Sequence, residues 1–196
     1  MVHESTRRSF LQLPLAAAAL ALASKMRAAT DDKSRDSTRA SQGFRVGANH
    51  DRHGEDLRIM GGKFNLLISS DDSGGDLLIY DTSRRQKGGP AFHRHHAQDE
   101  WFYVLRGEFV VRVGDETLTL RPGDSAFAPR KIPHAFAMTS EGEGQMLVLF
   151  QPAGSMEHFF HEMGKLGPAI PQNQETALKK LWADHGMEIV GPPLKI

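Results

Sequence analysis

Short β-rich segments separated by turn residues dominate this chain from about Asp56 to Gln151. The turn residues between them form clusters such as Gly-Gly, Arg-Gly, Gly-Asp and Glu-Gly-Glu-Gly. Many short strands with turns at this spacing are typical of a β-sandwich or a β-barrel. The expected strands are residues 57–60, 64–69, 77–82, 101–105, 109–113, 117–120, 125–128, 134–138 and 145–151. The pattern therefore predicts an all-β fold.

Two turns and the C-terminal pattern add to this prediction. Residues 113–116, Val-Gly-Asp-Glu, fit a two-residue hairpin, and residues 121–124, Arg-Pro-Gly-Asp, fit a tight turn in which proline fixes φ before glycine.

After residue 151, Ser155 is positioned to cap a helix that runs to Lys165, and Asn173 to cap a second helix that ends at Gly186. The second helix carries an apolar stripe that we expect to pack on the barrel, formed by Leu178, Leu181 and Trp182. Residues 187–190 are a candidate last strand.

The N-terminal segment is typical of an export signal. Arg7-Arg8 and Phe10-Leu11 precede an apolar run over residues 13–23 that ends in Ala-x-Ala. The paired arginines resemble the twin-arginine signal of bacteria, which is read by the twin-arginine translocase. The apolar run spans only about 16 Å at 1.5 Å per residue, about half of a bilayer core, so we expect no stable membrane anchor. The signal predicts a periplasmic or secreted protein.

The chain therefore divides into four expected parts. Residues 1–23 form the signal peptide, and residues 24–47 form a polar leader that we expect to be disordered. Residues 48–153 form the β-barrel, and residues 154–196 form its helical cover. The sequence contains no internal repeat and no second core, which indicates one folded domain.

Composition narrows the chemistry available to this domain. The sequence contains no Cys, which excludes disulfide scaffolds, cysteine-ligated zinc fingers, iron–sulfur clusters and cysteine nucleophiles. Lys+Arg and Asp+Glu balance at 24 each, so the chain offers no basic field for nucleic acid and no polybasic membrane patch. The sequence has 10 His, and imidazole is the commonest metal ligand. The composition therefore favours a protein that binds a metal through His, Asp or Glu and acts on or binds a small molecule.

Four residues have the spacing of such a metal site. His93 and His95 point the same way in an extended strand, because side chains alternate between faces. Glu100 follows five residues later, far enough for a turn to return it from the adjacent strand, and His134 on a distant strand could close the site. Three imidazoles and one carboxylate suit Fe(II), Mn(II), Ni(II), Co(II), Cu(II) or Zn(II) and leave positions open for a substrate or dioxygen.

These residues resemble the motifs of the cupin superfamily. The first motif is matched by His93-x-His95, Glu100 after four residues and Gly107 after six more, and the second by Gly123, Pro129 and His134. The closest likeness is to small single-domain cupins described as quercetin-dioxygenase-like. The resemblance implies a double-stranded β-helix (jelly roll) with the metal inside the barrel, and cupins are often homodimers. Two positions depart from the pattern: Lys131 replaces a usual Gly, and Met138 replaces a usual Asn that is not a ligand in most members.

Metal coordination alone does not identify a reaction. By alternation, four apolar residues share the ligand face and predict an aromatic, apolar substrate pocket: Phe102, Val104, Phe136 and Met138. We therefore expect oxygenation of an aromatic or polyphenolic compound. In quercetinase-like members the ligand Glu is held to take the substrate proton, and the resemblance assigns this catalytic role to Glu100.

Two other functions remain open from the sequence. One is a non-enzymatic binding protein that captures a metal or a metal-bound ligand. The other is an isomerase or decarboxylase of a small polar acid, which is favoured if Arg94, Arg130 or Lys131 points inward. Alternation places Arg94 on the opposite face from the ligands.

The remaining candidate residues support weaker predictions. His96 faces away from the ligand pair, which predicts that it either supports the ligands from behind or lies on the surface. Trp101 and Tyr103 share this outer face, where we expect them to pack under the C-terminal helices or in a dimer interface. On the first predicted helix, His158 and His161 lie beside two Glu and form a candidate surface metal pair, although a polar helix face is the favoured interpretation. His185 is explained as a cation near a helix C-terminus.

Overall fold

The computed structural model describes residues 39–167 and 175–196. The expected signal peptide, residues 24–38 of the expected leader and the expected cap at Asn173 lie outside the described residues. Residues 39–47 carry no strand or helix, and the Ala40 amide donates to the carbonyl oxygen of Asp72 at 3.0 Å. Among the described helices, none combines the length and the apolar character needed to cross a bilayer.

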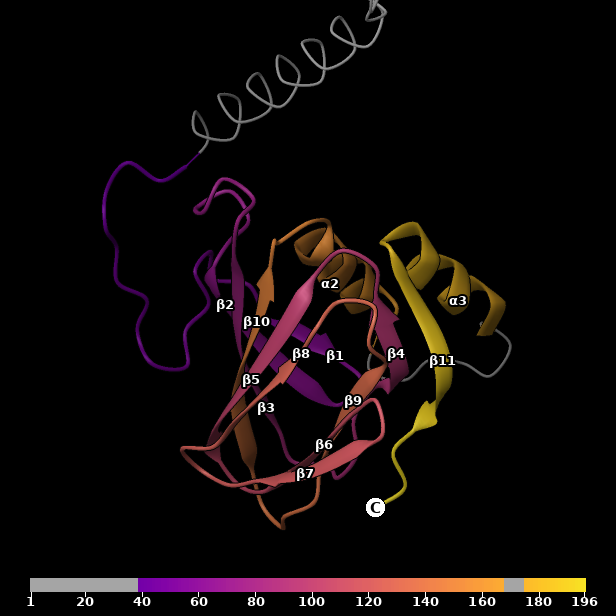
Figure 1. Ribbon diagram of the computed structural model, residues 1–196. Coiled ribbons are helices and arrows are strands. Elements are labelled where there is room, and N and C mark those ends of the chain that lie inside the picture. Colours follow the sequence, from indigo (N-terminus) through magenta and orange to yellow (C-terminus); the bar gives the residue numbers. More distant parts are fainter. Residues whose placement is uncertain (1–38, 168–174) are drawn as a thin grey trace, which may run out of the picture. The chain divides into compact units, whose positions relative to one another are not determined.

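The described residues form two antiparallel β-sheets and two short helices (Figure 1). The strands are β1 (Leu57–Ile59), β2 (Gly62–Ile68), β3 (Leu78–Arg84), β4 (Ala91–His95), β5 (Asp99–Arg106), β6 (Phe109–Val113), β7 (Glu116–Leu120), β8 (Ser125–Ala128), β9 (His134–Met138), β10 (Gly144–Gln151) and β11 (Met187–Pro193). The helices are α2 (Met156–Lys165) and α3 (Glu175–Asp184). The prediction of an all-β jelly roll with two C-terminal helices is confirmed.

The order of the strands in each sheet brings together parts of the chain that are far apart in sequence. The first sheet has the order β1-β2-β3-β10-β5-β8, and the second has the order β11-β4-β9-β6-β7. β10 thus lies between β3 and β5, and β9 lies between β4 and β6. This interleaving closes two sheets over one core, which is why residues of β4, β5 and β9 can face one point.

Local sequence explains the shortest connections. Val113 pairs with Glu116, so Gly114 and Asp115 form the expected two-residue hairpin, with Gly114 at φ 58°. In the predicted tight turn, the Asp124 amide donates to the carbonyl oxygen of Arg121 at 2.8 Å. Turn chemistry read from the sequence therefore places these strand ends correctly.

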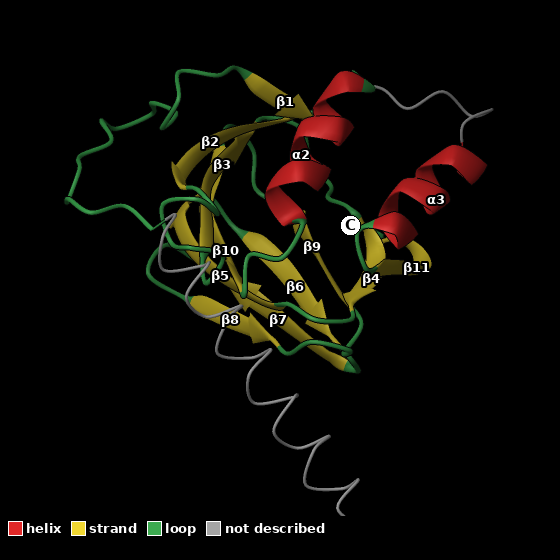
Figure 2. Ribbon diagram, turned by 90° about the horizontal axis from the view of Figure 1, so that it is seen from above, coloured by secondary structure: helices red, strands yellow, loops and turns green. Residues whose placement is uncertain are grey.

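The C-terminal segment contributes both helices and a strand. α2 buries one apolar stripe against the barrel, formed by Met156, Phe159, Phe160 and Met163. In α3, Trp182 is buried, and Leu178 and Leu181 pack against the same core, as the apolar stripe predicts. β11 pairs with β4 and so extends the second sheet, at one edge of which Figure 2 shows α3. The described residues of the C-terminal segment, 154–167 and 175–196, thus complete the barrel as well as cover it.

Candidate metal centre

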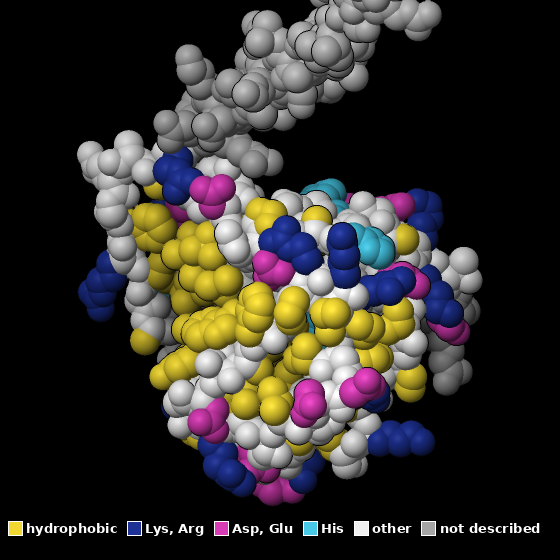
Figure 3. Space-filling view, in the orientation of Figure 1, with side chains coloured by type: hydrophobic (Ala, Val, Ile, Leu, Met, Phe, Trp, Pro, Cys, Tyr) yellow, Lys and Arg dark blue, Asp and Glu magenta, His cyan; other side chains and the backbone are white. Residues whose placement is uncertain are grey.

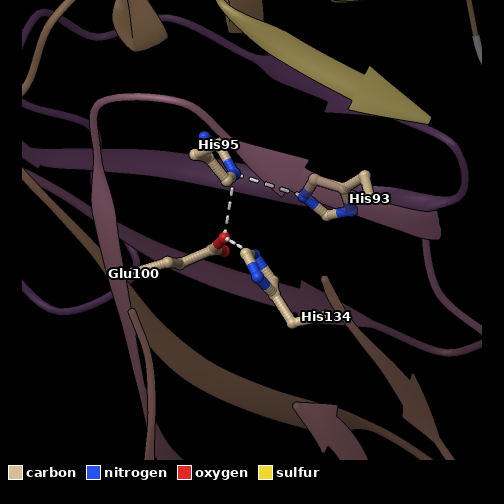
Figure 4. A group of neighbouring side chains, drawn as sticks. All are labelled: His93, His95, Glu100 and His134. Carbon is tan, nitrogen blue, oxygen red and sulfur yellow. Dashed lines mark hydrogen bonds and ion pairs between the residues drawn. The ribbon is translucent and has the colours of Figure 1, made fainter. Parts of the chain in front are cut away.

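Four polar side chains from three strands meet inside the barrel (Figure 4). Strand alternation turns His93 and His95 of β4 inward, and Glu100 is the first inward-facing residue of β5. His134 begins β9 and lies directly opposite His93 in the pairing of β4 with β9. All four side chains are buried, with exposed fractions between 0% and 6%. The structure thus brings together the four ligands expected from the sequence.

A glycine before β4 permits this close packing of strands. A Cβ atom on Gly89 would lie 1.7 Å from the backbone oxygen of Phe136, so the segment passes β9 at a distance that no side chain allows. The neighbouring residue, Gly88, exchanges two backbone hydrogen bonds with Met138 at 3.0 and 3.1 Å. These contacts hold the start of β4 against β9.

The donor atoms of the four side chains lie at short and similar distances. The Nε2 atoms of His93 and His95 are 3.2 Å apart. Glu100 Oε2 lies 3.2 Å from His95 Nε2 and 2.8 Å from His134 Nε2. A donor atom from each of the four residues lies within 4.8 Å of the others.

Hydrogen bonds to the backbone orient two of the imidazoles. His93 Nδ1 is 2.8 Å from the carbonyl oxygen of Ala91, and His134 Nδ1 is 2.9 Å from that of Ile132. Because a carbonyl oxygen only accepts, Nδ1 carries the proton in both rings, and Nε2 of the neutral ring presents a lone pair. The lone pair of His134 then faces a carboxylate oxygen, and two such acceptors repel unless a proton or a metal ion lies between them.

Burial and the contacts of Glu100 with its imidazole neighbours set the pKa values within the cluster. Burial, together with the imidazoles of His134 and His95, lowers the pKa of His93 to about 3, so this ring is neutral. Burial opposes ionisation of Glu100, but its hydrogen bonds with His134 and His95 outweigh burial and hold its pKa below the usual range. Burial also opposes protonation of His134, yet the hydrogen bond and the charge of Glu100 raise its pKa.

The spacing of the donor atoms fits a metal coordination sphere. Ligand atoms at about 2.1 Å from an ion lie about 3.0 Å apart at right angles and about 3.4 Å apart in a tetrahedron. The three measured separations, 2.8, 3.2 and 3.2 Å, fall close to these values. The mixture of imidazole nitrogen and carboxylate oxygen suits Fe, Mn, Ni, Co, Cu or Zn. The residues present therefore fit a divalent transition metal.

A mainly apolar pocket leads to this centre. Besides His93, His95 and Glu100, the pocket is lined by Ile59, Met60, Gly62, Phe64, Thr82, Arg84, Gly89, Pro90, Phe136, Val148, Phe150, Met156, Phe159, Phe160, Met163, Trp182 and Met187. Aromatic rings line much of it, and Trp182 meets the His93 ring edge-on at 4.8 Å between centroids. Phe150 lies 5.6 Å from the His95 ring.

The predicted pocket residues are placed only in part as expected. Phe136 lines the pocket, but Phe102, Val104 and Met138 are fully buried in the core and do not. Alternation gave the correct face for all three, because each points into the barrel. They do not line the pocket, because they lie further along β5 and β9, where side chains fill the interior of the barrel. Phe102 contacts the rings of His134 and Phe136 there.

Of the two positions expected for His96, behind the ligands or on the surface, the structure shows the surface. His96 is exposed, and its backbone amide donates to the carbonyl oxygen of Gly186 at 2.9 Å. β4 ends at His95, so the next residue turns out of the barrel.

None of the three cations that could have turned inward does so. Arg94 pairs with Glu188 at 2.6 Å, Arg130 pairs with Asp99 at 2.6 Å, and Lys131 is exposed.

Sequence reasoning missed a cation that lines the pocket. Arg84 ends β3 and donates from Nη2 to the carbonyl oxygen of Met60 at 2.8 Å, while its Nε is buried without a partner among the described residues. Burial lowers the pKa of Arg84. Arg84 follows the inward-facing Tyr80 and Thr82 at the same two-residue spacing, and this parity is the signal that could have identified it.

Comparison with known proteins gives one family match and one curated relative. Residues 84–150, about a third of the chain, match the Cupin domain family, and this range contains all four ligands. An uncharacterised protein of Streptomyces coelicolor is 37% identical over 60 residues, which are 31% of this chain and 56% of that protein. The chain thus matches just over half the length of this curated relative. The domain match and the fold support the cupin superfamily.

Solved structures include similar chains. KdgF from Halomonas sp. is 24% identical, with 55% of this chain and 94% of that chain covered and a TM-score of 0.45. An RmlC-like cupin from Shewanella frigidimarina is 25% identical, with 58% and 93% covered and a TM-score of 0.45.

Proposed function

We propose that this cupin is a metal-binding protein that acts as a metal-dependent dioxygenase on an aromatic or polyphenolic, quercetin-like small molecule. One observation carries the proposal: three imidazoles and one carboxylate at coordination spacing lie in a pocket whose other walls are largely apolar and aromatic. Such walls bind an aromatic ring by apolar contact and ring packing, whereas they offer little to a sugar phosphate.

The residues of the centre have separable roles in this proposal. Held by His93, His95, Glu100 and His134, a divalent transition metal would supply Lewis acidity and the chemistry of dioxygen. Glu100 is a buried carboxylate whose Oε2 lies beside the imidazole nitrogens of His95 and His134, and we assign it the additional role of accepting the hydroxyl proton of the substrate. The surrounding rings, among them Phe150 and Trp182, exclude water and stack on the substrate.

A second candidate function is favoured by Arg84. An isomerase or decarboxylase of a small polar acid needs a cation beside the metal to bind a carboxylate. Arg84 lines the pocket, and its Nε has no partner in the part of the chain that the structure describes, although the cations considered from the sequence all point outward. Aromatic walls around a single arginine fit an aromatic anion better than a small polar acid, so this function ranks second.

Metal content and oxygen uptake test the proposal together. Elemental analysis of the purified protein is expected to find about one more Fe, Mn, Ni, Co, Cu or Zn per chain than in His93→Ala/His95→Ala. Dioxygen uptake over a panel of flavonols and catechols is expected to require both the substrate and this metal. His93→Ala/His95→Ala should remove the barrel metal and the uptake together.

Each alternative predicts a different result in the same experiment. Tight metal binding without uptake on any flavonol or catechol contradicts the dioxygenase and favours a non-enzymatic metal- or ligand-binding protein. Loss of a small acid without dioxygen uptake favours the isomerase or decarboxylase. Metal content that stays unchanged in His93→Ala/His95→Ala contradicts the centre itself.

We also propose that the protein is exported through the twin-arginine translocase to the periplasm or beyond. The proposal is based on Arg7-Arg8 and the apolar run over residues 13–23. Fusion of residues 1–47 to a reporter that folds before export should deliver the reporter to the periplasm. Arg7→Lys/Arg8→Lys should retain it in the cytoplasm, and delivery that survives this change would contradict the proposal.

We propose that the outer face of the first sheet binds a second copy of this chain, which forms a homodimer. Trp101 and Tyr103 stack there at 5.6 Å between centroids, next to exposed Phe127 and Leu105. Figure 3 shows hydrophobic side chains gathered on this side of the molecule. Sedimentation should give a dimer that Phe127→Asp converts to a monomer, and a monomeric wild type would contradict the proposal.

A further inference from the structure

A second group of metal-ligand side chains lies outside the barrel centre. It consists of His158 and Glu162 on α2 and of His185, the residue that follows α3. A donor atom from each residue lies within 4.8 Å of the other two. These residues are not used by the function proposed above.

His185 is held in a fixed orientation against the start of α2. Its Nδ1 donates to the carbonyl oxygen of Ser155 at 3.2 Å, and the Ser155 hydroxyl donates to the carbonyl oxygen of His185 at 3.4 Å. The residue is 7% exposed, and its ring packs edge-on against Phe159. Because Nδ1 carries the proton, the Nε2 lone pair of the neutral ring points at Glu162 Oε2, 3.2 Å away.

Glu162 faces both imidazoles. It lies one helical turn after His158, and its Oε1 atom is 3.5 Å from His158 Nε2. The rings of His158 and His185 are 5.2 Å apart between centroids. This arrangement repeats that of the barrel centre, where an imidazole anchored to a backbone carbonyl through Nδ1 turns Nε2 toward a carboxylate oxygen.

We propose that His158, Glu162 and His185 bind one divalent transition-metal ion that joins α2 to the end of α3. Two imidazole nitrogens and one carboxylate oxygen suit Zn²⁺ and similar borderline ions, whereas Ca²⁺ and Mg²⁺ prefer all-oxygen ligands. The His158 side chain is 67% exposed, so solvent reaches the cluster and water can complete the coordination.

The proposed site lies close to the wall of the barrel pocket. Trp182 precedes His185 by three residues and lines the pocket of the barrel centre. Its ring contacts His93 at 4.8 Å and Phe159 of α2 at 5.2 Å between centroids. Figure 2 shows α2 and α3 side by side. An ion that joins the two helices therefore restrains the helix that carries one aromatic wall of the pocket.

Zinc counting in a chain without the barrel ligands tests the proposal. The His93→Ala/His95→Ala variant is stripped with a chelator, dialysed against ZnCl₂ and assayed for bound zinc. We expect one zinc ion per chain, bound at least tenfold more weakly after addition of His158→Ala or of Glu162→Gln. Circular dichroism should show that each variant keeps its fold, since both substituted side chains are partly or largely exposed.

His161→Ala is the matched control. His161 lies on the same helix, but its Nδ1 faces Glu55 at 3.2 Å, so His161 does not pair with His158, in line with the polar helix face favoured from the sequence. Zinc binding should survive this change. Absence of zinc from the His93→Ala/His95→Ala variant, or binding that is equally tight after His158→Ala, would overturn the proposal.

Thermal melting tests whether the ion joins the helices. In the His93→Ala/His95→Ala background, zinc at ten times its Kd should raise Tm by about 3–6 °C, and the rise should vanish with His158→Ala. An unchanged Tm with zinc bound would show that the ion does not stabilise the helix pair, which contradicts the proposed clamp.

Discussion

His93 and His134 are oriented by their own strands. In each, Nδ1 donates to the carbonyl oxygen two residues earlier, at Ala91 and Ile132 respectively. The tautomer is therefore set by the local backbone and needs no partner side chain. His95 differs, because its Nδ1 is buried without a partner among the described residues. At the scale of single residues, two of the three imidazoles are preorganised for metal binding through Nε2.

Arg84 should set the charge preference of the pocket. In Arg84→Met, the side-chain length is largely kept, but the cation and its buried Nε donor are lost. A charged hydrogen bond is worth about 1.5–3 kcal/mol, so KM for an anionic aromatic substrate should rise about 10–150-fold. Steady-state kinetics on a substrate and on its uncharged analogue measure the effect, which should be absent for the analogue.

The control for this variant is Arg94→Met. Arg94 pairs with Glu188 outside the pocket, so KM should not change. Equal losses for the charged and the neutral substrate in Arg84→Met would indicate a packing role and contradict the proposed charge recognition.

Lys131 occupies a backbone conformation that favours glycine. Its φ is 70°, and its amide donates to the carbonyl oxygen of His95 at 2.6 Å. The left-handed region costs a non-glycine residue about 1–2 kcal/mol, and glycine loses about 0.5–1 kcal/mol in chain entropy. Lys131→Gly should therefore raise the free energy of unfolding by about 0.5–1 kcal/mol in urea denaturation. Lys131→Ala removes the same side chain without relieving φ, and a similar gain in that variant would refute the explanation.

At the scale of elements, alternation within a strand explains why the ligand set could be predicted. His93 and His95 are two residues apart on β4, and Glu100 comes early on the next strand, so periodicity alone orients them. The pocket wall could not be predicted in this way. Phe150 reaches it because β10 lies between β3 and β5, and Trp182 because α3 folds back over the barrel. Such contacts depend on pairings between distant segments.

The connection between β2 and β3 depends on one carboxylate. Asp72 accepts hydrogen bonds from Arg52 Nε and Nη2 and from the Ser69 amide, each at 3.1 Å. Burial opposes its ionisation, but the hydrogen bonds from Arg52 and Ser69 outweigh burial and lower the pKa of Asp72. Ionised Asp72 therefore ties this connection to the segment before β1.

This pKa shift predicts how stability depends on pH. A carboxyl group with a lowered pKa in the folded state stabilises the fold above its unfolded pKa of about 3.9, and this stabilisation is lost as pH falls through the folded pKa. Asp72→Asn should lower the free energy of unfolding at pH 7 by about 1–3 kcal/mol. The loss should shrink below about pH 4. Urea denaturation at pH 7, 4 and 3 measures this loss of unfolding free energy, with Asp71→Asn as the control. A loss of equal size at every pH would exclude the ionised carboxylate as the cause.

For the whole molecule, the all-β class could be read from the spacing of strands and turns, and the jelly roll from the resemblance of two motifs. The strand order could not be derived from alternation, because β3 pairs with β10 and β4 with β9 across long stretches of chain. That order joins the two sheets at the candidate metal centre, where β4 and β9 of one sheet face β5 of the other. Metal binding should therefore act on the stability of the entire barrel.

Metal binding at the barrel centre is linked to folding of the whole chain. The unfolded chain holds the four ligands apart, so a bound ion stabilises the folded state alone. At 100 times its Kd, an ion contributes about 2.7 kcal/mol, which corresponds to a rise in Tm of about 5–10 °C for a chain of this size. Calorimetry is best performed in the His158→Ala background, so that only the barrel centre responds. His93→Ala/His95→Ala should remove the rise, because it deletes both ligands of β4 and leaves Glu100 and His134 as the remaining pair. An equal rise with and without these two ligands would mean that the ion stabilises the protein from somewhere other than the barrel.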